Sequence, residues 1–314
     1  ASSDDGAQEL EAVPAPVPTS GGATQALEWH APTLVRIDET CTIPRLLQDR
    51  VGRSPRRPLI LRKLGMGDAW RPVSARDFHE EVQQVAAGLI ARGLEPGQRV
   101  AIMSRTRYEW TLLDFACWSA GLVPVPIYET SSIDQVAHVL TDADVDLVVT
   151  ETVSLAEIVR TAAERTGRHH VVVLSLDSEA IETLVADGAG VPRATVAART
   201  GALTKDDIST IVYTSGTTGT PKGTVLTHEN FTNLCLNSHA WMPEIAAGED
   251  SRLLLFLPLA HVFARFLQVF QISGNGVMAH VSNIKNLLPD LASFRPSYLL
   301  VVPRVLEKIY NSAD

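Results

Sequence analysis

Hydrophobic residues follow two alternating patterns along this chain. Short apolar runs, typical of strands covered on both faces, are separated by longer segments in which apolar residues recur every three or four positions, as on one face of a helix. The segment 75–92 shows the helical pattern, with Phe78, Val82, Val85 and Leu89 on one face. Ser74 can cap its first turn, and Gly93 suits the left-handed residue that ends a helix. These signals predict a helix over residues 75–92.

The same reading extends over most of the chain. The predicted strands cover residues 59–62, 99–103, 123–127, 147–150, 171–174, 208–213, 253–256, 277–281 and 298–302. The predicted helices cover residues 75–92, 110–120, 133–140, 228–241, 262–272 and 284–294, and a last helix starts at Pro303. This alternation predicts an α/β fold of multi-layer βαβ subdomains with mostly parallel sheets. Residues 99–127 and 252–281 share the order strand, apolar helix, glycine, strand, which suggests two related halves.

The first 33 residues differ in character from the rest. They are small, polar, acidic and punctuated by Pro14, Pro16 and Pro18, so they have little apolar surface to bury. We expect a disordered tail over residues 1–33 and a folded domain over residues 34–314.

Composition narrows the class of protein. Of the 314 residues, 45% are hydrophobic and 20% are charged, which is ordinary for a globular protein. The net charge of −9 argues against a nucleic-acid partner, because phosphate contacts need clustered Lys and Arg. The three cysteines lie far apart without a CxxC pair, which disfavours a zinc ribbon and fits a reducing compartment.

No segment predicts export or membrane insertion. The N-terminal residues lack the basic and apolar regions of a leader, and the apolar stretch 253–272 is interrupted by Pro258, His261 and Arg265. We therefore expect a cytoplasmic protein. Peripheral contact with a membrane and a homodimer stay open.

The most informative segment for chemistry runs from Ile211 to Val225. Gly216 and Gly219 allow backbone amides to turn toward an anion. Hydroxyl donors come from Thr214, Ser215, Thr217, Thr218 and Thr220, and Lys222 adds an ammonium group. This combination predicts a polyphosphate site. It is not a Walker A loop, because Gly223 follows the lysine where that motif needs Ser or Thr, so a P-loop phosphotransferase is disfavoured.

The segment 213–223, Tyr-Thr-Ser-Gly-Thr-Thr-Gly-Thr-Pro-Lys-Gly, resembles the phosphate-loop motif of the AMP-forming adenylating enzymes. Leu257-Pro-Leu-Ala-His261 is similar to a second motif of this family. The run 302–310, Val-Pro-Arg-Val-Leu-Glu-Lys-Ile-Tyr, resembles the long-chain fatty acyl-CoA synthetase branch. At Arg265 the chain departs from some long-chain members, which carry an aromatic gate four residues after the histidine.

The resemblance implies a two-step reaction that uses ATP, Mg²⁺, a fatty acid and coenzyme A. It assigns phosphate binding to Thr214, Ser215, Gly216, Thr217, Thr218, Gly219 and Lys222, and it gives Thr214 a further role at Mg²⁺. It makes Lys222 and His261 the catalytic candidates, with His261 near the fatty-acid carboxylate.

Other parts of the family pattern are not found in this sequence. We see no Tyr-Gly-x-Thr-Glu segment, no Thr-Gly-Asp segment and no C-terminal lid domain with its adenylation lysine. The chain therefore reads as an AMP-binding N-terminal domain truncated before its end, and we expect it to be nearly inactive alone. Two other interpretations stay open: an adenylating enzyme that delivers the acyl group to a carrier-protein thiol, and a nucleotide- or acyl-binding module without catalysis.

Overall fold

The computed structural model describes residues 32–63, 65, 69–214, 221–246, 248 and 250–301. The chain divides into two units, Ala1–Thr33 and Leu34–Asp314, and the second unit is described below. The predicted helix from Pro303 and most of the predicted tail lie outside the described residues. Within the described residues, no helix combines the length and apolar character needed to cross a bilayer.

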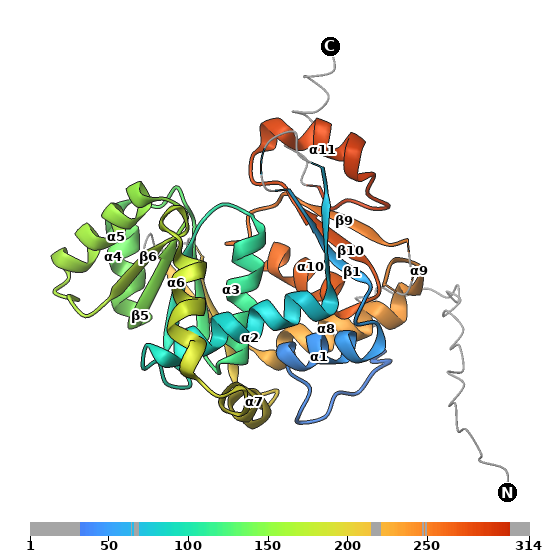
Figure 1. Ribbon diagram of the computed structural model, residues 1–314, viewed down its shortest axis with the longest axis horizontal. Helices are drawn as coiled ribbons and strands as arrows, with labels where there is room; N and C mark the ends of the chain where they lie inside the picture. The colour runs from blue at the N-terminus through green and yellow to red at the C-terminus, as the bar shows by residue number, and fades with distance from the viewer. Residues whose placement is uncertain are drawn as a thin grey trace, which may run out of the picture. The chain divides into compact units, whose positions relative to one another are not determined.

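Strands of the second unit form two four-stranded sheets and a separate hairpin (Figure 1). The first sheet has the order β2-β1-β10-β9 and consists of β1 (Pro58–Arg62), β2 (Arg71–Ser74), β9 (Arg252–Leu255) and β10 (Val277–His280). The second has the order β4-β3-β5-β6 and consists of β3 (Arg99–Met103), β4 (Val123–Ile127), β5 (Val145–Thr150) and β6 (Val172–Ser175). The hairpin joins β7 (Ile208–Thr214) and β8 (Lys222–Thr227). In the described part of the chain, the pairs β1–β2 and β7–β8 are antiparallel and the other pairs are parallel.

The helices cover both faces of each sheet. They are α1 (Ile43–Arg53), α2 (Ala75–Ala91), α3 (Tyr108–Ser119), α4 (Ile133–Asp142), α5 (Val153–Arg165), α6 (Ala180–Asp187), α7 (Arg193–Ala202), α8 (His228–Trp241), α9 (Pro243–Ala246), α10 (Val262–Ser273) and α11 (Leu287–Phe294). Single 3-10 turns lie at η1 (Leu176–Ser178), η2 (Gly188–Gly190) and η3 (Ile284–Asn286).

Alternate residues of one strand point into different cores. On β3, Val100 and Ile102 join the central core with α2, α3 and α10, whereas Ala101 and Met103 pack against α4 and α5. On β9, Leu253 and Leu255 join the same central core, and Leu254 packs against α11. The central helices therefore lie between the two sheets, with α4 and α5 outside one sheet and α11 outside the other. This confirms the predicted α/β fold, and it explains the nearly continuous apolar runs of the strands.

Several predicted elements are confirmed closely. The strands 99–103 and 123–127 and the helix 228–241 match to the residue. Ser74 accepts a hydrogen bond from the Asp77 amide at the start of α2, and Gly93 has φ of 80° after its end. The two similar segments do form two halves, because β3-α3-β4 belongs to one sheet and β9-α10-β10 to the other.

Other elements escaped the sequence pattern or differ from it. The pattern missed α1, β2, α5, α6, α7, β8 and α9. The predicted helix 284–294 is divided into η3 and α11. The predicted strand 298–302 appears, within the described residues, as a single parallel bridge between Tyr298 and Leu253.

Helix α2 packs against the end of α6 and the following turn η2 at a pair of glycines, Gly88 and Gly188. A Cβ atom on Gly88 would lie 2.0 Å from the Leu184 carbonyl oxygen, and one on Gly188 would lie 2.5 Å from the Gly88 nitrogen. Both contacts are with backbone, which cannot rotate away. This packing therefore requires glycine at both positions.

We expect Gly88→Ala to lower the free energy of unfolding by about 1–3 kcal/mol, because the added methyl group overpacks this contact. Gly52→Ala is the matched control, since a Cβ on Gly52 of α1 meets nothing within 4 Å. That change should raise stability by about 0.5 kcal/mol through helix propensity. Urea unfolding followed by circular dichroism measures both, and equal effects of the two substitutions would contradict the packing argument.

Candidate functional site

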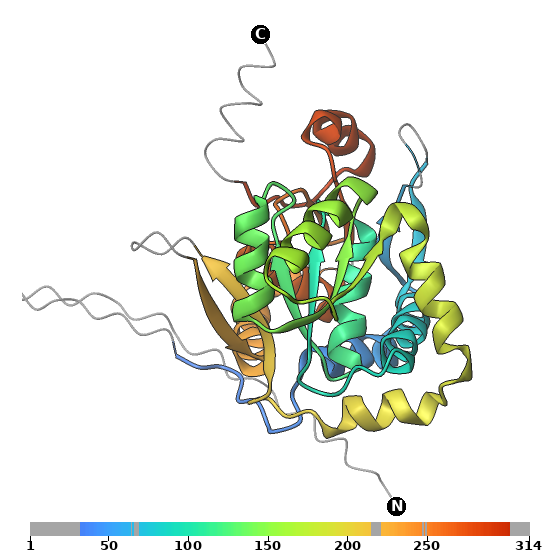
Figure 2. The ribbon, with the colours of Figure 1, turned by 90° about the vertical axis from the view of Figure 1, so that its left-hand side faces the viewer.

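The hairpin β7–β8 carries two of the predicted site residues and brings them together. Thr214 ends β7, Lys222 begins β8, and the two are cross-strand partners (Figure 2, where the hairpin is the pair of gold strands at the left). Both residues are exposed. The Lys222 side chain has neither a hydrogen-bond nor an ion-pair partner in the part of the chain that the structure describes. The other predicted phosphate-binding residues, Ser215, Gly216, Thr217, Thr218 and Gly219, lie outside the described residues.

The base of the hairpin is tied to the rest of the domain by buried polar contacts. The Trp118 indole donates to the Ser209 carbonyl oxygen at 2.7 Å, and the Thr210 hydroxyl donates to the Pro124 carbonyl oxygen at 2.7 Å. Thr214 and Lys222 form the open end of the hairpin, which we call the hairpin mouth. Next to Thr214, the Tyr213 hydroxyl donates to Asp142 at 2.6 Å. A methyl group at Gly223 would lie 3.1 Å from the Tyr213 ring, so glycine leaves room for this ring. The exposed mouth thus stands on a fixed base.

His261 lies at the start of α10 as its N-cap. Its ring Nδ1 accepts a hydrogen bond from the Phe263 amide at 3.2 Å, and the side chain is exposed. Because Nδ1 accepts, the neutral ring carries its proton on Nε2, which can donate to an incoming oxygen. Among the described residues, His261 makes no hydrogen bond to Thr214 or Lys222. The structure thus places it on a different element from the hairpin.

Thr106 fixes the loop that leads to His261. Its hydroxyl donates to the Leu257 carbonyl oxygen at 2.7 Å and accepts from the Leu259 amide at 3.1 Å. Thr106 follows β3, so the loop is held at the carboxyl end of the second sheet. Ligands of open α/β sheets bind at such carboxyl edges.

A cavity of about 730 Å³ opens where the carboxyl ends of β1, β3, β5 and β10 meet. Four cationic side chains line it, namely Arg62, Lys63, Arg105 and Arg107, together with four carboxylates, Glu109, Glu151, Asp177 and Asp290. The sequence analysis did not identify this cavity. Its residues come from segments far apart in the chain, which no local motif brings together.

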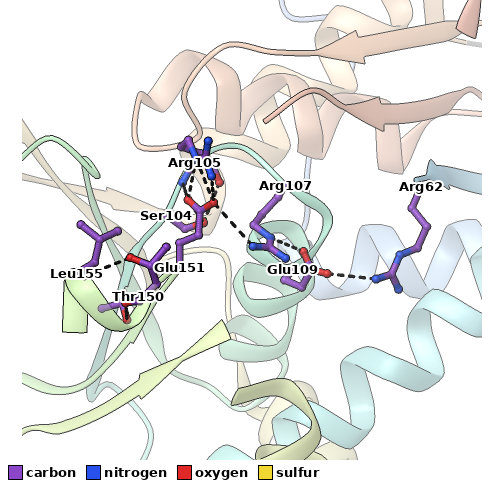
Figure 3. Close-up of polar contacts among 9 residues, drawn as sticks. Arg62, Ser104, Arg105, Arg107, Glu109, Thr150, Glu151 and Leu155 are labelled. Carbon is purple, nitrogen blue, oxygen red and sulfur yellow. Dashed lines mark hydrogen bonds and ion pairs between the residues drawn. The ribbon is translucent and has the colours of Figure 1, made fainter. Parts of the chain in front are cut away.

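Alternating charges connect along the cavity wall (Figure 3). Arg62 pairs with Glu109 at 3.1 Å, and Arg107 pairs with the other oxygen of Glu109 at 2.6 Å. Arg105 pairs with Glu151 at 2.5 Å and also donates its backbone amide to that carboxylate at 2.8 Å. Since cations and carboxylates balance, the wall offers little net charge to a polyphosphate. The Lys222 side chain, by contrast, is exposed and has no ion-pair partner among the described residues.

The two glutamates of the wall are ionised well below neutral pH. Burial raises the pKa of Glu151, but hydrogen bonds from the side chain and backbone of Arg105 more than offset it, so the net shift is downward. The pKa of Glu109 is lowered in the same way, with Arg107 outweighing burial. Carboxyl groups whose pKa is lower in the folded state stabilise the fold above their ordinary pKa of 4.5 and lose that contribution as the pH falls.

We expect Glu151→Gln to lower the free energy of unfolding by about 1–2 kcal/mol at neutral pH, since the partner Arg105 is partly exposed and screened. The difference from the wild type should shrink as the pH falls below 4.5, where the carboxyl group of the unfolded wild type takes up a proton, and it should be gone once the pH is below the lowered pKa of the folded state. Urea unfolding at a series of pH values measures this. Glu157→Gln, in a pair where both side chains are largely exposed, is the control and should show almost no effect. A pH-independent loss for Glu151→Gln would contradict the explanation.

The sequence analysis also missed a polar network inside the central core. Arg265 on α10 and Asp114 on α3 are buried, with exposures of 0% and 1%, and they pair through two contacts of 2.7 and 3.1 Å. Burial raises the pKa of Asp114, and the Arg265 guanidinium opposes that shift. Arg265 therefore cannot act as a swinging gate, because its charge is held inside the domain. The sequence did contain a signal for this pair. Asp114 and Arg265 each lie within an apolar helical segment, and charged residues are rarely buried without a partner.

Hydrogen bonds extend this network from Asp114 to His280, which lines the cavity. Gln268 donates to Asp114 at 2.6 Å and accepts from the Thr111 hydroxyl at 2.9 Å. The ring Nε2 of His280 lies 2.8 Å from the Thr111 oxygen. Burial lowers the pKa of His280 to about 4, so the ring is neutral at pH 7. Because a carboxylate only accepts, each donor in the series points toward Asp114, and His280 carries its proton on Nε2.

We expect Asp114→Asn to lower the free energy of unfolding by about 3–5 kcal/mol, because the Arg265 charge would stay buried without its counter-charge. Asp134→Asn is the control, since Asp134 pairs with Arg165 on the surface at 90% exposure and should contribute less than about 0.5 kcal/mol. Thermal and urea unfolding measure both variants. A loss for Asp114→Asn as small as that of the surface control would show that the buried pair adds nothing.

Comparisons with known proteins find similarity over most of the chain. The family described as AMP-binding enzyme matches residues 47–314. The chain is 42% identical over 250 residues to the long-chain-fatty-acid–CoA ligase FadD15 of Mycobacterium bovis. That match covers 78% of this chain and 41% of the relative, so the chain spans less than half the length of the ligase.

Solved structures show the same fold. VinN superposes with a TM-score of 0.72 at 18% identity, covering 88% of this chain and 64% of VinN. ATP-bound MatB of Rhodopseudomonas palustris superposes with a TM-score of 0.70 at 25% identity, covering 87% of this chain and 51% of MatB. The two-sheet arrangement is thus shared with proteins of different sequence.

Proposed function

The chain belongs to the AMP-binding enzyme family, and from this premise we propose that it carries the ATP-binding part of a long-chain fatty-acid–CoA ligase. In the first step, a fatty-acid carboxylate oxygen attacks the α-phosphorus of ATP, which gives the acyl-adenylate and releases pyrophosphate. In the second step, the thiol of coenzyme A attacks the acyl carbon and AMP leaves. The similarity to a long-chain-fatty-acid–CoA ligase supports this choice of acid and thiol.

The observation that carries the proposal is the pairing of Thr214 with Lys222 at the hairpin mouth. Both side chains are exposed, and the ammonium group has no partner among the described residues, so it is available to the triphosphate. The seven residues between them belong to the segment that resembles the phosphate-loop motif. The triphosphate would therefore bind against a hydroxyl and a cation held on adjacent strands.

Charge stabilisation accounts for the chemistry, because neither step needs a protein nucleophile. Lys222 would bind the outer phosphates and favour departure of pyrophosphate. The Thr214 hydroxyl would hold Mg²⁺, which when bound neutralises part of the phosphate charge. His261 would donate from Nε2 to a fatty-acid carboxylate oxygen and orient it, since its Nδ1 is already occupied by the Phe263 amide.

Two other functions use the same hairpin. An adenylating enzyme could pass the acyl group to a carrier-protein thiol, and a binding module could hold nucleotide without turnover. The carrier-protein enzyme differs from the ligase only in the thiol that accepts the acyl group. An assay of acyl transfer with and without coenzyme A therefore distinguishes the two. The ligase is favoured because the relative with 42% identity is a CoA ligase.

We expect Lys222→Ala to weaken ATP binding by about tenfold to a hundredfold, because a charge-assisted hydrogen bond to phosphate is worth about 1.5–3 kcal/mol. The melting temperature should stay unchanged, since Lys222 is exposed and has no partner within the described range. Isothermal titration of the chain with MgATP measures the affinity. Lys285→Ala removes another exposed lysine and should bind ATP as the wild type does. If the wild type binds no ATP, or if Lys222→Ala binds equally well, the proposal is wrong.

A further inference from the structure

Arg265 contacts both elements that carry the proposed site. It lies on α10 one turn after the N-cap His261, and its Nη1 donates to the Thr210 hydroxyl at 2.5 Å. Thr210 lies on β7, four residues before Thr214. One guanidinium therefore connects the helix of His261 with the strand that delivers the phosphate-binding hairpin.

Its surroundings leave this guanidinium no freedom to move. Asp114 on α3 occupies Nε and Nη2 at 3.1 and 2.7 Å, and the Trp118 ring lies 5.4 Å from its central carbon. Gln268, from the same face of α10, holds the carboxylate of Asp114 at 2.6 Å. A planar guanidinium bound through two nitrogens to one carboxylate has a single orientation, so the third contact, from Nη1 to Thr210, has a fixed direction.

The Thr210 side chain is also fixed in place by its contacts. It is 0% exposed, and its hydroxyl proton goes to the Pro124 carbonyl oxygen on β4 at 2.7 Å. The oxygen of that hydroxyl is then left to accept from Arg265. The hydroxyl thus joins β7 to the second sheet on one side and to α10 on the other.

We propose that Arg265 is a positioning residue, which acts through Thr210 to set the hairpin of Thr214 and Lys222 relative to the helix of His261. This role rests on the proposed function, because it assumes that the hairpin binds the triphosphate. Arg265 itself is buried and touches neither phosphate nor acid. It would change the affinity for ATP by changing the geometry of the hairpin mouth.

The test uses Thr210→Val, which keeps the shape of the side chain but removes the hydroxyl. Thr210→Ser restores the hydroxyl and is the conservative rescue. Thr200→Val is the matched control, because Thr200 is also buried and donates to a backbone carbonyl, that of Ser119 at 2.8 Å, which joins α7 to α3 and not to a hairpin strand. Each variant of the whole chain is titrated with MgATP at a temperature well below its melting temperature. Hydrogen exchange of the β7 and β8 amides is measured without nucleotide.

We expect Thr210→Val to bind ATP about tenfold more weakly, in line with the loss of a hydrogen bond to a charged group. The same variant should show faster hydrogen exchange in β7 and β8. Thr210→Ser should return the ATP affinity and the exchange rates to within about twofold of the wild type. Thr200→Val should lower the melting temperature without changing the ATP affinity or the exchange. Wild-type affinity and exchange in a folded Thr210→Val chain would overturn the inference. So would equal losses in Thr200→Val, which would mean a merely structural effect.

Two further outcomes are also decisive. If Thr210→Val does not fold, Arg265→Lys replaces it, since lysine keeps a cation beside Asp114 but lacks the second arm that reaches Thr210. The same loss of affinity and protection supports the role, and its absence refutes it. If the wild type binds no ATP, the proposed function fails, and hydrogen exchange alone then decides whether Arg265 holds the hairpin.

Discussion

The buried pair between Arg265 and Asp114 constrains the arrangement of the whole domain. A charge removed from water is tolerated only where a partner and further hydrogen bonds compensate for its lost hydration. Here the partners come from α3, α10 and β7, and they meet at 0% and 1% exposure. Any relative shift of these elements would leave a charge unpaired inside the core. The pair therefore selects one packing of the central helices, between two sheets whose apolar contacts alone would permit small displacements.

The two charged regions of the domain differ in how their charges are used. Along the cavity wall, arginines and glutamates alternate and satisfy one another, which links the ends of β1, β3 and β5. At the hairpin mouth, Lys222 stands exposed and without a partner within the described residues. A satisfied network stabilises the junction of the sheets, whereas an unsatisfied cation is available to a ligand. The domain thus separates the charges that maintain its shape from the charge that is proposed to bind phosphate.

The β7–β8 hairpin is fixed at its base and exposed at Thr214 and Lys222, and this arrangement suits the proposed reaction with ATP. Transfer of the adenylyl group of ATP to a carboxylate depends on the placement of donors around developing charge, and misplacement by a fraction of an ångström weakens each contact. The contacts of Trp118, Thr210 and Tyr213 hold the base of the hairpin to the second sheet and its helices. VinN has the same fold at 18% sequence identity. The fold is therefore compatible with very different sequences.

The sequence by itself determined the features that depend on near neighbours. The period of apolar residues identified the strands 99–103 and 123–127 and the helix 228–241 to the residue, because helix and strand periodicity and capping act over three or four positions. The motif around Thr214 and Lys222 identified the family for the same reason, since a phosphate loop is a contiguous segment. Only the tertiary structure showed that Thr214 and Lys222 are cross-strand partners in an antiparallel hairpin. Only the tertiary structure paired Arg265 with Asp114, 151 residues away. Contacts at that separation depend on how the sheets and helices pack, and neither periodicity nor local motif carries that information.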